Sequence, residues 1–291
     1  MSRRGWFLFI LVGFLWGIPY LFIKVAVDPD DGFSPATVVF LRTAIGAAIL
    51  IPIAIKQRQL IAAIRGWRYV FAYALLEMIG PWILIGTAEQ KISSGLAGLL
   101  VASVPIWATI FASMRGDKSV WHHTRLFGII AGFIGLVAVV GIESITGSAD
   151  PLSIAMVLVA SVGYSYAVMM VQGALPHVSG IAINAVAMAM TAIFYLPWSI
   201  IQWPTHQISQ GAVLSIIGLG VLSTGAAFAA FFTLASIIGV ARGSLVTYLN
   251  TAIAVVLGVI ILNEPLTVGI VLGLPLVLIG SYFASRKPVA K

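Results

Sequence analysis

The sequence predicts an all-α polytopic membrane protein with ten transmembrane helices. Of its 291 residues, 60% are hydrophobic and only 9% are charged, and the mean hydropathy is +1.09. Soluble domains carry about 25% charged residues, so this composition excludes a soluble enzyme, a disordered chain and a nucleic-acid-binding domain. A transmembrane helix takes about 20 apolar residues, so ten of them leave only short loops. The chain has no Cys, which excludes disulfides and thiolate metal sites.

Ten apolar runs mark the expected helices, each bounded by short polar or charged segments. The runs cover residues 6–27, 36–55, 67–87, 95–114, 126–142, 152–172, 180–202, 211–238, 241–262 and 267–284. The first run follows two arginines, as a signal peptide does, but it is too long for the apolar core of one. We therefore expect it to be retained as the first helix.

The distribution of Lys and Arg predicts that both termini are cytoplasmic. Cytoplasmic loops of membrane proteins are enriched in these residues. With the N-terminus inside, inner segments hold 13 of the 16 basic residues and outer loops hold only Lys91. Lys24 and Arg42 lie within helices. Most acids, among them Glu89 and Glu264, fall in outer segments, which leaves Glu77 as the one acid expected deep in the membrane.

The two halves of the chain are similar to each other. A shift of 147 residues aligns residues 94–117 with 241–264. Each half then has five helices, and an odd number inverts the second half relative to the first. Inverted repeats of this kind are typical of secondary transporters, which bind substrate near the midplane between the repeats. We expect one repeat in residues 1–145 and the other in residues 146–291.

Motifs across the whole chain carry a family resemblance. They are Trp16-Gly17, Lys24, Arg42, Ser94-Gly95-Leu96-Ala97 with Pro105, and Gly243-Ser244, Leu249-Asn250, Gly258, Asn263-Glu264-Pro265-Leu266, Gly269, Gly273 and Gly280. In these motifs the chain resembles the EamA family of the drug/metabolite transporter superfamily. The resemblance implies ten helices in two inverted repeats, a bacterial inner membrane location and export of small metabolites. Size, termini and aromatic-rich helices make the chain similar to YddG-type aromatic amino acid exporters of that family.

Charged residues within the membrane are the first candidates for function, because they are costly there. Glu77 is expected near the midplane, where it would bind a substrate ammonium group or take up a proton; the alternative is a structural acid paired with Arg42 or with the backbone. Arg42 is expected mainly to support packing. Lys24 is expected to extend to the lipid headgroups, with a role in binding a substrate carboxylate as the alternative.

Prolines and glycines mark where helices are expected to break or approach closely. Pro19, Pro81 and Pro105 interrupt the first, third and fourth helices at similar depth. An ordinary kink is the better explanation for any one of them, but three breaks at one depth raise the odds of a cavity there. The family usually has a proline where this chain has Ala252, so the ninth helix is expected to be straighter. Glycine pairs at four-residue spacing let helices pack tightly, and they predict that 126–142 packs against 267–284, away from the substrate pathway.

Aromatic and amide side chains complete the predicted cavity. Trp16 and Tyr20 share a helix face, as do Tyr73 and Glu77. Aromatic faces stack on planar apolar ligands and their polar groups bind the ligand's polar end; packing is the competing explanation. The expected lining residues are Trp16, Tyr20, Tyr73, Glu77, Pro81, Tyr164, Phe228, Tyr248 and Asn250.

No enzyme or nucleotide-binding motif is present, and the four His residues lie in loops or at helix ends. We expect no enzymatic activity, no cofactor, no metal and no nucleic-acid partner. The predicted function is export of a small metabolite, with aromatic amino acids favoured, by alternating access. The alternatives are export of a nucleoside, a sugar or a cationic drug, or a facilitative channel. Proton coupling and oligomeric state stay open at this point.

Overall fold

The computed structural model describes residues 2–145, 150–238 and 245–285, and the secondary structure in these ranges is entirely helical. Eight helical segments are long and apolar enough to span a membrane, and two shorter apolar helices accompany them. The uninterrupted ones are α1 (Arg3–Ala26), α2 (Pro35–Lys56), α8 (His123–Ile145), α9 (Pro151–Ala174), α10 (Gly180–Ile201), α14 (Val246–Ile261) and α15 (Val268–Ser285).

Three segments are composite. They are α4 (Trp67–Ala74) with η1 (Leu75–Ile79) and α5 (Gly80–Glu89); α6 (Ser94–Val101) with α7 (Val104–Met114); and α11 (Gln210–Ile217) with η3 (Gly218–Ala226) and α12 (Ala227–Ile238). Two short helices, α3 (Leu60–Arg65) and η2 (Lys118–Trp121), lie between spans. The apolar runs therefore predicted every long helix to within a few residues, except that residues 239–244 lie outside the described part of the chain.

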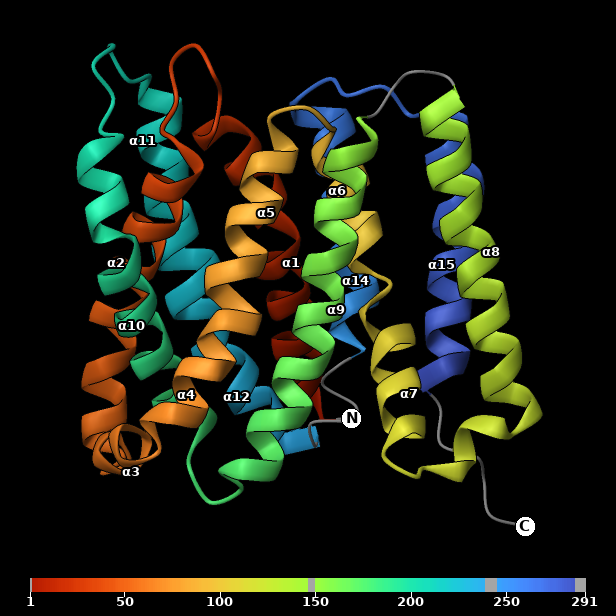
Figure 1. Ribbon diagram of the computed structural model, residues 1–291, viewed down its shortest axis with the longest axis horizontal. Coiled ribbons are helices and arrows are strands. Elements are labelled where there is room, and N and C mark those ends of the chain that lie inside the picture. The colour runs from red at the N-terminus through yellow and green to blue at the C-terminus, as the bar shows by residue number, and fades with distance from the viewer. Residues whose placement is uncertain (1, 146–149, 239–244, 286–291) are drawn as a thin grey trace.

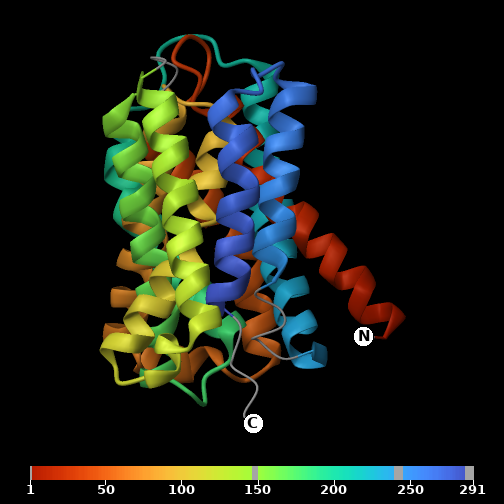
Figure 2. The same ribbon diagram turned by 90° about the vertical axis from the view of Figure 1, so that its right-hand side faces the viewer.

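The helices run back and forth between two ends of a bundle, and α1 starts at the same end at which α15 finishes (Figure 1). We call this the inner end, because the described basic residues outside the helix interiors, except Lys91, gather there, as in cytoplasmic loops. The N-terminal part of α1 extends away from the other helices (Figure 2). Its apolar side chains, including Trp6 and Phe7, are exposed, as expected of a surface that meets lipid.

Of the three expected proline breaks, only the one at Pro105 interrupts its helix as predicted. Pro105 does break the fourth span, since α6 ends at Val101 and α7 begins at Val104. Pro19, however, lies inside the continuous helix α1. Its missing donor removes one intrahelical bond without ending the helix. Pro81 lies in the first turn of α5, directly after a π-helical segment.

The ninth span confirms the effect of Ala252. Shifted by 147, the break after Val101 falls at residues 249–250, and α14 runs through this point without interruption. The same shift places η1 at residues 222–226, which lie within η3. A π-helical turn is rare and frequently marks a functional site. The third helix of each half therefore carries this feature at a corresponding position.

Helices α8 and α15 form the predicted glycine-mediated pair. A methyl group on Gly128 would overlap backbone atoms of Gly280 and Ala284, so the two backbones touch. Both views show the pair side by side at one edge of the bundle (Figures 1 and 2). The buried residues form three hydrophobic clusters. The first extends from α1, α5, α6 and α9 to α8 and α15, the second lies mainly among α2, α4 and α10, and a small third one joins α1, α12 and α14. Tyr164 packs against the first two.

Candidate functional site

Glu77 lies in η1, in the middle of the third span. Its Oε2 atom is buried and has no hydrogen-bond partner. In a π-helical turn one residue is added per turn, so backbone bonds are realigned and side chains are redirected. Tyr195 of α10 stabilises this turn by donating a 2.7 Å hydrogen bond to the carbonyl oxygen of Ile79. On the opposite side Gly163 of α9 lies against the carbonyl of Leu76, an approach that a side chain would block.

Arg42 is not paired with Glu77. No ion pair among the described residues joins the two. The guanidinium lies 3.7 Å above the ring of Trp82, and its Nε atom donates to the hydroxyl of Thr224 at 3.0 Å. Gly46, one turn along α2, makes room for Thr224. The expected structural alternative for Glu77, pairing with Arg42, is therefore wrong.

Four more predicted residues gather around Glu77 and Arg42. The hydroxyl of Tyr73 donates to Asn184 Oδ1 at 3.2 Å and lies within electrostatic range of Glu77. Tyr164 interacts electrostatically with Glu77, Arg42 and Tyr20. Pro81 is buried in the first turn of α5. Side chains of α1, α2, α4, η1 and α9 thus form one polar cluster inside an apolar bundle, and its residues are Tyr20, Arg42, Tyr73, Glu77 and Tyr164.

An aromatic group lies next to this polar cluster, on its inner side. The ring of Trp16 lies 5.6 Å from Phe228 and 4.7 Å from Phe231. Trp16 precedes Tyr20 by four residues in α1, and Phe228 follows Thr224 by four residues. One such step is about 6 Å along a helix, so the aromatic group is about one turn closer to the inner end.

A cavity of about 370 Å³ opens at the inner end between α2, α10 and α12. Gln57, Ser179, Thr233 and Ser236 supply its polar lining, and Phe232 forms part of its apolar lining. The ring of Phe232 is stacked on that of Phe228 at 6.3 Å. Phe232 therefore connects the lining of the cavity to the aromatic group.

Two further predicted lining residues have their described contacts with other groups. Tyr248 of α14 has its ring 6.2 Å from Tyr282 of α15, which places it toward the α8–α15 edge. Asn250 lies where α14 packs on α1, with its carbonyl oxygen next to Gly17, and its Oδ1 accepts a hydrogen bond from Thr251. No described contact brings either residue to Trp16 or Glu77.

Lys24 and Glu89 differ from their predictions. The ammonium group of Lys24 does not extend outward but donates to the carbonyl oxygens of Glu89 and Ile92, at 2.6 and 3.0 Å. These carbonyls lie at and beyond the C-terminus of α5, where backbone acceptors lack helical partners. Glu89 is not an outer-loop acid, because it is the last residue of α5 and is fully buried. Glu77 is therefore not the only acid inside the bundle.

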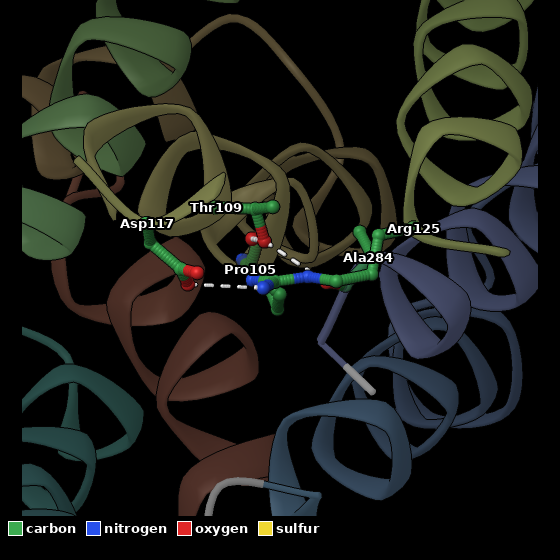
Figure 3. A network of polar contacts seen from close by, with 5 residues as sticks. All are labelled: Pro105, Thr109, Asp117, Arg125 and Ala284. Carbon is green, nitrogen blue, oxygen red and sulfur yellow. Dashed lines mark hydrogen bonds and ion pairs between the residues drawn. The ribbon is translucent and has the colours of Figure 1, made fainter. Parts of the chain in front are cut away.

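The loops that end the fourth and ninth spans both place a carboxylate in a polar network. At the outer end, Glu264 accepts hydrogen bonds from Ser94 N, Ser94 Oγ and Gly95 N, at the start of α6. At the inner end, Arg125 donates to Asp117 at 3.1 Å and to the carbonyl of Ala284 at 3.0 Å, and Thr109 donates to the same carbonyl (Figure 3). These contacts tie α6 to α14 at one end and α7, α8 and α15 together at the other.

Four residues of the site were not among the predicted lining residues. Thr224, Trp82, Asn184 and Tyr195 hold Arg42, Tyr73 and η1 in place. Thr224 had one signal, since the repeat shift aligns it with Glu77. In the described residues no group of three His, Asp or Glu side chains is arranged to hold a metal ion.

The model of the EamA-like transporter family matches residues 3–141 and again residues 151–286. The chain belongs to the EamA-like transporter family. It is 26% identical to a transporter of Archaeoglobus fulgidus and 26% identical to the transporter YoaV of Bacillus subtilis, over 98% and 96% of this chain and 99% and 97% of the relatives. It is 24% identical to the inner membrane transporter YedA of Escherichia coli, over 94% of this chain and 90% of YedA.

This EamA-like protein is therefore a multi-pass membrane transporter, which points away from an enzyme. The names of these relatives state no substrate. A crystal structure that covers 98% of this chain and 97% of its own has the same fold, with a TM-score of 0.68 at 16% identity.

Proposed function

We propose that this transporter exports small metabolites across a bacterial inner membrane by alternating access through a central cavity between two inverted repeats. Amino acids are the favoured substrates, and aromatic amino acids in particular, as in the YddG-type exporters that the chain resembles. The observation that carries the proposal is a polar cluster inside the bundle that contains the carboxylate of Glu77 and the guanidinium of Arg42, with an aromatic group on its inner side.

The polar cluster suits the charged end of an amino acid. The unpartnered Oε2 of Glu77 can accept a hydrogen bond from an ammonium group, which also removes the free-energy cost of an unpaired buried acceptor. Arg42 offers a planar donor for the carboxylate.

The aromatic group suits an aromatic side chain. Rings prefer edge-to-face or offset contacts with centroids about 4.5–7 Å apart, and Trp16, Phe228 and Phe231 already adopt them. A substrate with its charged end at Glu77 and Arg42 would place its ring about one helical turn toward the inner end, at these residues.

Pockets of similar size lie at both ends of the bundle, about 370 Å³ at the inner end and about 320 Å³ at the outer end. The inner cavity of about 370 Å³ lies within the usual range of about 300–1,000 Å³ for ligand sites. At the outer end Glu264 holds the start of α6, and Lys24 holds the end of α5. Substrate would enter from the cytoplasm, and release outside would require these outer contacts to separate.

Two observations support the inverted repeats, with boundaries at residues 1–145 and 146–291. The family model matches the two halves separately. The π-helical turn of η1 also coincides with part of η3 when the chain is shifted by 147 residues. The inner membrane location is supported by the name of YedA, an inner membrane transporter.

The second candidate is a cationic metabolite or drug, favoured by the unpartnered Oε2 of Glu77 and by the neighbouring rings. Export of a nucleoside or a sugar, and facilitative flux through a channel, are the remaining alternatives. Binding of labelled phenylalanine, labelled threonine and a cationic dye to the purified protein distinguishes the first two.

In that experiment Glu77→Gln should reduce phenylalanine binding at least tenfold, whereas Asp30→Asn, in an outer loop, should leave it unchanged. A tenfold change corresponds to about 1.4 kcal/mol, which is small for loss of a charged partner at a buried site. Binding of phenylalanine that is equal in the wild type and in Glu77→Gln would overturn the assignment. Binding of the dye alone would favour the second candidate.

A further inference from the structure

Glu89 is a second buried carboxylate, nearer the outer end of the bundle than Glu77. It is fully buried, and neither of its carboxylate oxygens has a hydrogen-bond partner. No ion pair within 4.0 Å involves it among the described residues. It lies twelve residues after Glu77 on the same span, about 18 Å away along a helix, near the outer end.

Lys24 approaches Glu89 without pairing with its carboxylate. The ammonium group donates to the backbone carbonyl of Glu89 at 2.6 Å and to that of Ile92 at 3.0 Å. The ammonium group of Lys24 therefore binds backbone carbonyls at the end of α5 and not the carboxylate of Glu89. Burying an ionised carboxylate without hydrogen bonds is very unfavourable, whereas the neutral acid is tolerated far better.

The surroundings contain charges of both signs. The elements that pack against α5 bring Tyr20 and Lys24 from α1, Arg42 from α2, Glu77 from η1 and Tyr164 from α9. Glu264, which follows α14 and accepts hydrogen bonds from the start of α6, adds a negative charge that acts on Glu89. Lys24 and Arg42 disfavour a metal cation here, and the two nearest carbonyls are already bound to Lys24. A proton, in contrast, binds to one carboxylate oxygen of Glu89 and needs no further ligands and no cavity.

We propose that Glu89 is a proton-binding site, and that the outer end of the bundle closes only when this carboxylate carries a proton. When the outer end is open, the carboxylate accepts one proton from the outer solution and becomes a neutral carboxylic acid. Closure then buries the carboxylate as in this structure, where Glu264 accepts hydrogen bonds from the start of α6 and Lys24 of α1 donates to the end of α5. Deprotonation favours the open outer end, because an ionised Glu89 would again be hydrated.

The role of this proton site in closing the outer end rests on the proposed function, whereas proton binding by Glu89 does not. Proton binding is therefore measured first, without substrate, by infrared difference spectroscopy of the purified wild-type protein during a pH titration. The carbonyl stretch of a protonated carboxylic acid should be present and should disappear as the pH rises. It should be weaker in Glu89→Gln and unchanged in Asp28→Asn, a matched change in an exposed outer loop. A band of equal strength in Glu89→Gln and in the wild type, or no such band in the wild type, overturns the proposal.

Transport supplies the second test. The exchange rate of the wild type in proteoliposomes should fall as the outer pH rises, since fewer carriers can close. Glu89→Gln mimics the neutral acid, so it should fold as well as the wild type, exchange substrate and show a flat pH profile. Replacing sodium by choline should have no effect.

An unchanged pH profile in Glu89→Gln would contradict the proposal, and so would a large loss of thermal stability, because it would show that the structure needs the charge. If wild-type protein exchanges no substrate yet the infrared band depends on Glu89, the proton site stands and the proposed function fails.

Discussion

Arg42 Nε donates a hydrogen bond of 3.0 Å to Thr224 Oγ1, and Thr224 is the residue that the repeat shift aligns with Glu77. One π-helical turn therefore carries the carboxylate of the site and the corresponding turn in the other half carries the acceptor for its guanidinium. The contact joins α2 in the first half to η3 in the second. It is a direct link between the two halves next to the site.

Thr224→Val should destabilise the protein, because it leaves the buried Nε of Arg42 without an acceptor. The expected loss is about 1–3 kcal/mol, the range for a buried donor that loses its partner. Thr191→Val is the matched control, since Thr191 is equally buried but its hydroxyl bonds mainly within its own helix, to Ala187 O. Thermal unfolding in detergent compares the two. Equal losses in both variants would show that the hydroxyl of Thr224 has no special role.

Trp16→Leu should weaken binding of phenylalanine by about 2- to 13-fold, which corresponds to about 0.5–1.5 kcal/mol of aromatic contact. The residue lies in the aromatic group, which Phe232 connects to the lining of the inner cavity. Trp6→Leu, in the same helix but 54% exposed, should not change binding. If the Trp6 variant loses as much affinity as the Trp16 variant, the ring does not line the site.

Gly128→Ala should lower thermal stability, because the added methyl group meets the backbone of α15. Overpacking of this kind costs about 1–3 kcal/mol. Gly141→Ala in the same helix meets no atom within 4 Å and should be neutral or stabilising, by up to about 1 kcal/mol from helix propensity. Reversal of this order in thermal unfolding would mean that α8 and α15 do not pack as described.

Glu264→Gln should loosen the outer end. The carboxylate accepts three hydrogen bonds at the N-terminus of α6, where backbone donors and the helix dipole favour a negative charge. Losing the charge should cost about 1.5–3 kcal/mol, the range for hydrogen bonds to charged groups. Asp28→Asn is the control, since its carboxylate bonds only to the nearby Asp30 N among the described hydrogen bonds. Equal melting temperatures for the wild type and Glu264→Gln would contradict this account.

The sequence predicted the helices because transmembrane spans depend mainly on composition and length. Pro105 and Ala252 predicted the broken fourth span and the continuous ninth span, but Pro19 did not break α1, because one missing backbone donor does not by itself end a helix. The glycines of α8 and α15 predicted a pair, since close approach needs small residues on both surfaces.

The site was predicted only in part, because the direction of a side chain depends on tertiary packing. Glu77, Tyr73 and Tyr164 do converge, but Tyr248 points toward α15, and spacing along one helix cannot show which neighbour a face meets. Lys24 was expected at the headgroups, but the free carbonyls at the end of α5 offered acceptors that only the folded structure brings within reach. Glu89 looked like a loop acid because it ends a helix, and its burial comes from other spans.

Counterflow in proteoliposomes of the purified protein tests the central claim most directly. Vesicles are loaded with unlabelled phenylalanine or tryptophan and labelled tracer is added outside, with threonine, a nucleoside and a cationic dye as comparisons. A carrier with the proposed site should accumulate tracer transiently above equilibrium with the aromatic amino acids and not with the others. Tracer that only equilibrates, without transient accumulation, would indicate a channel, and accumulation of another substrate alone would contradict the aromatic amino acid assignment.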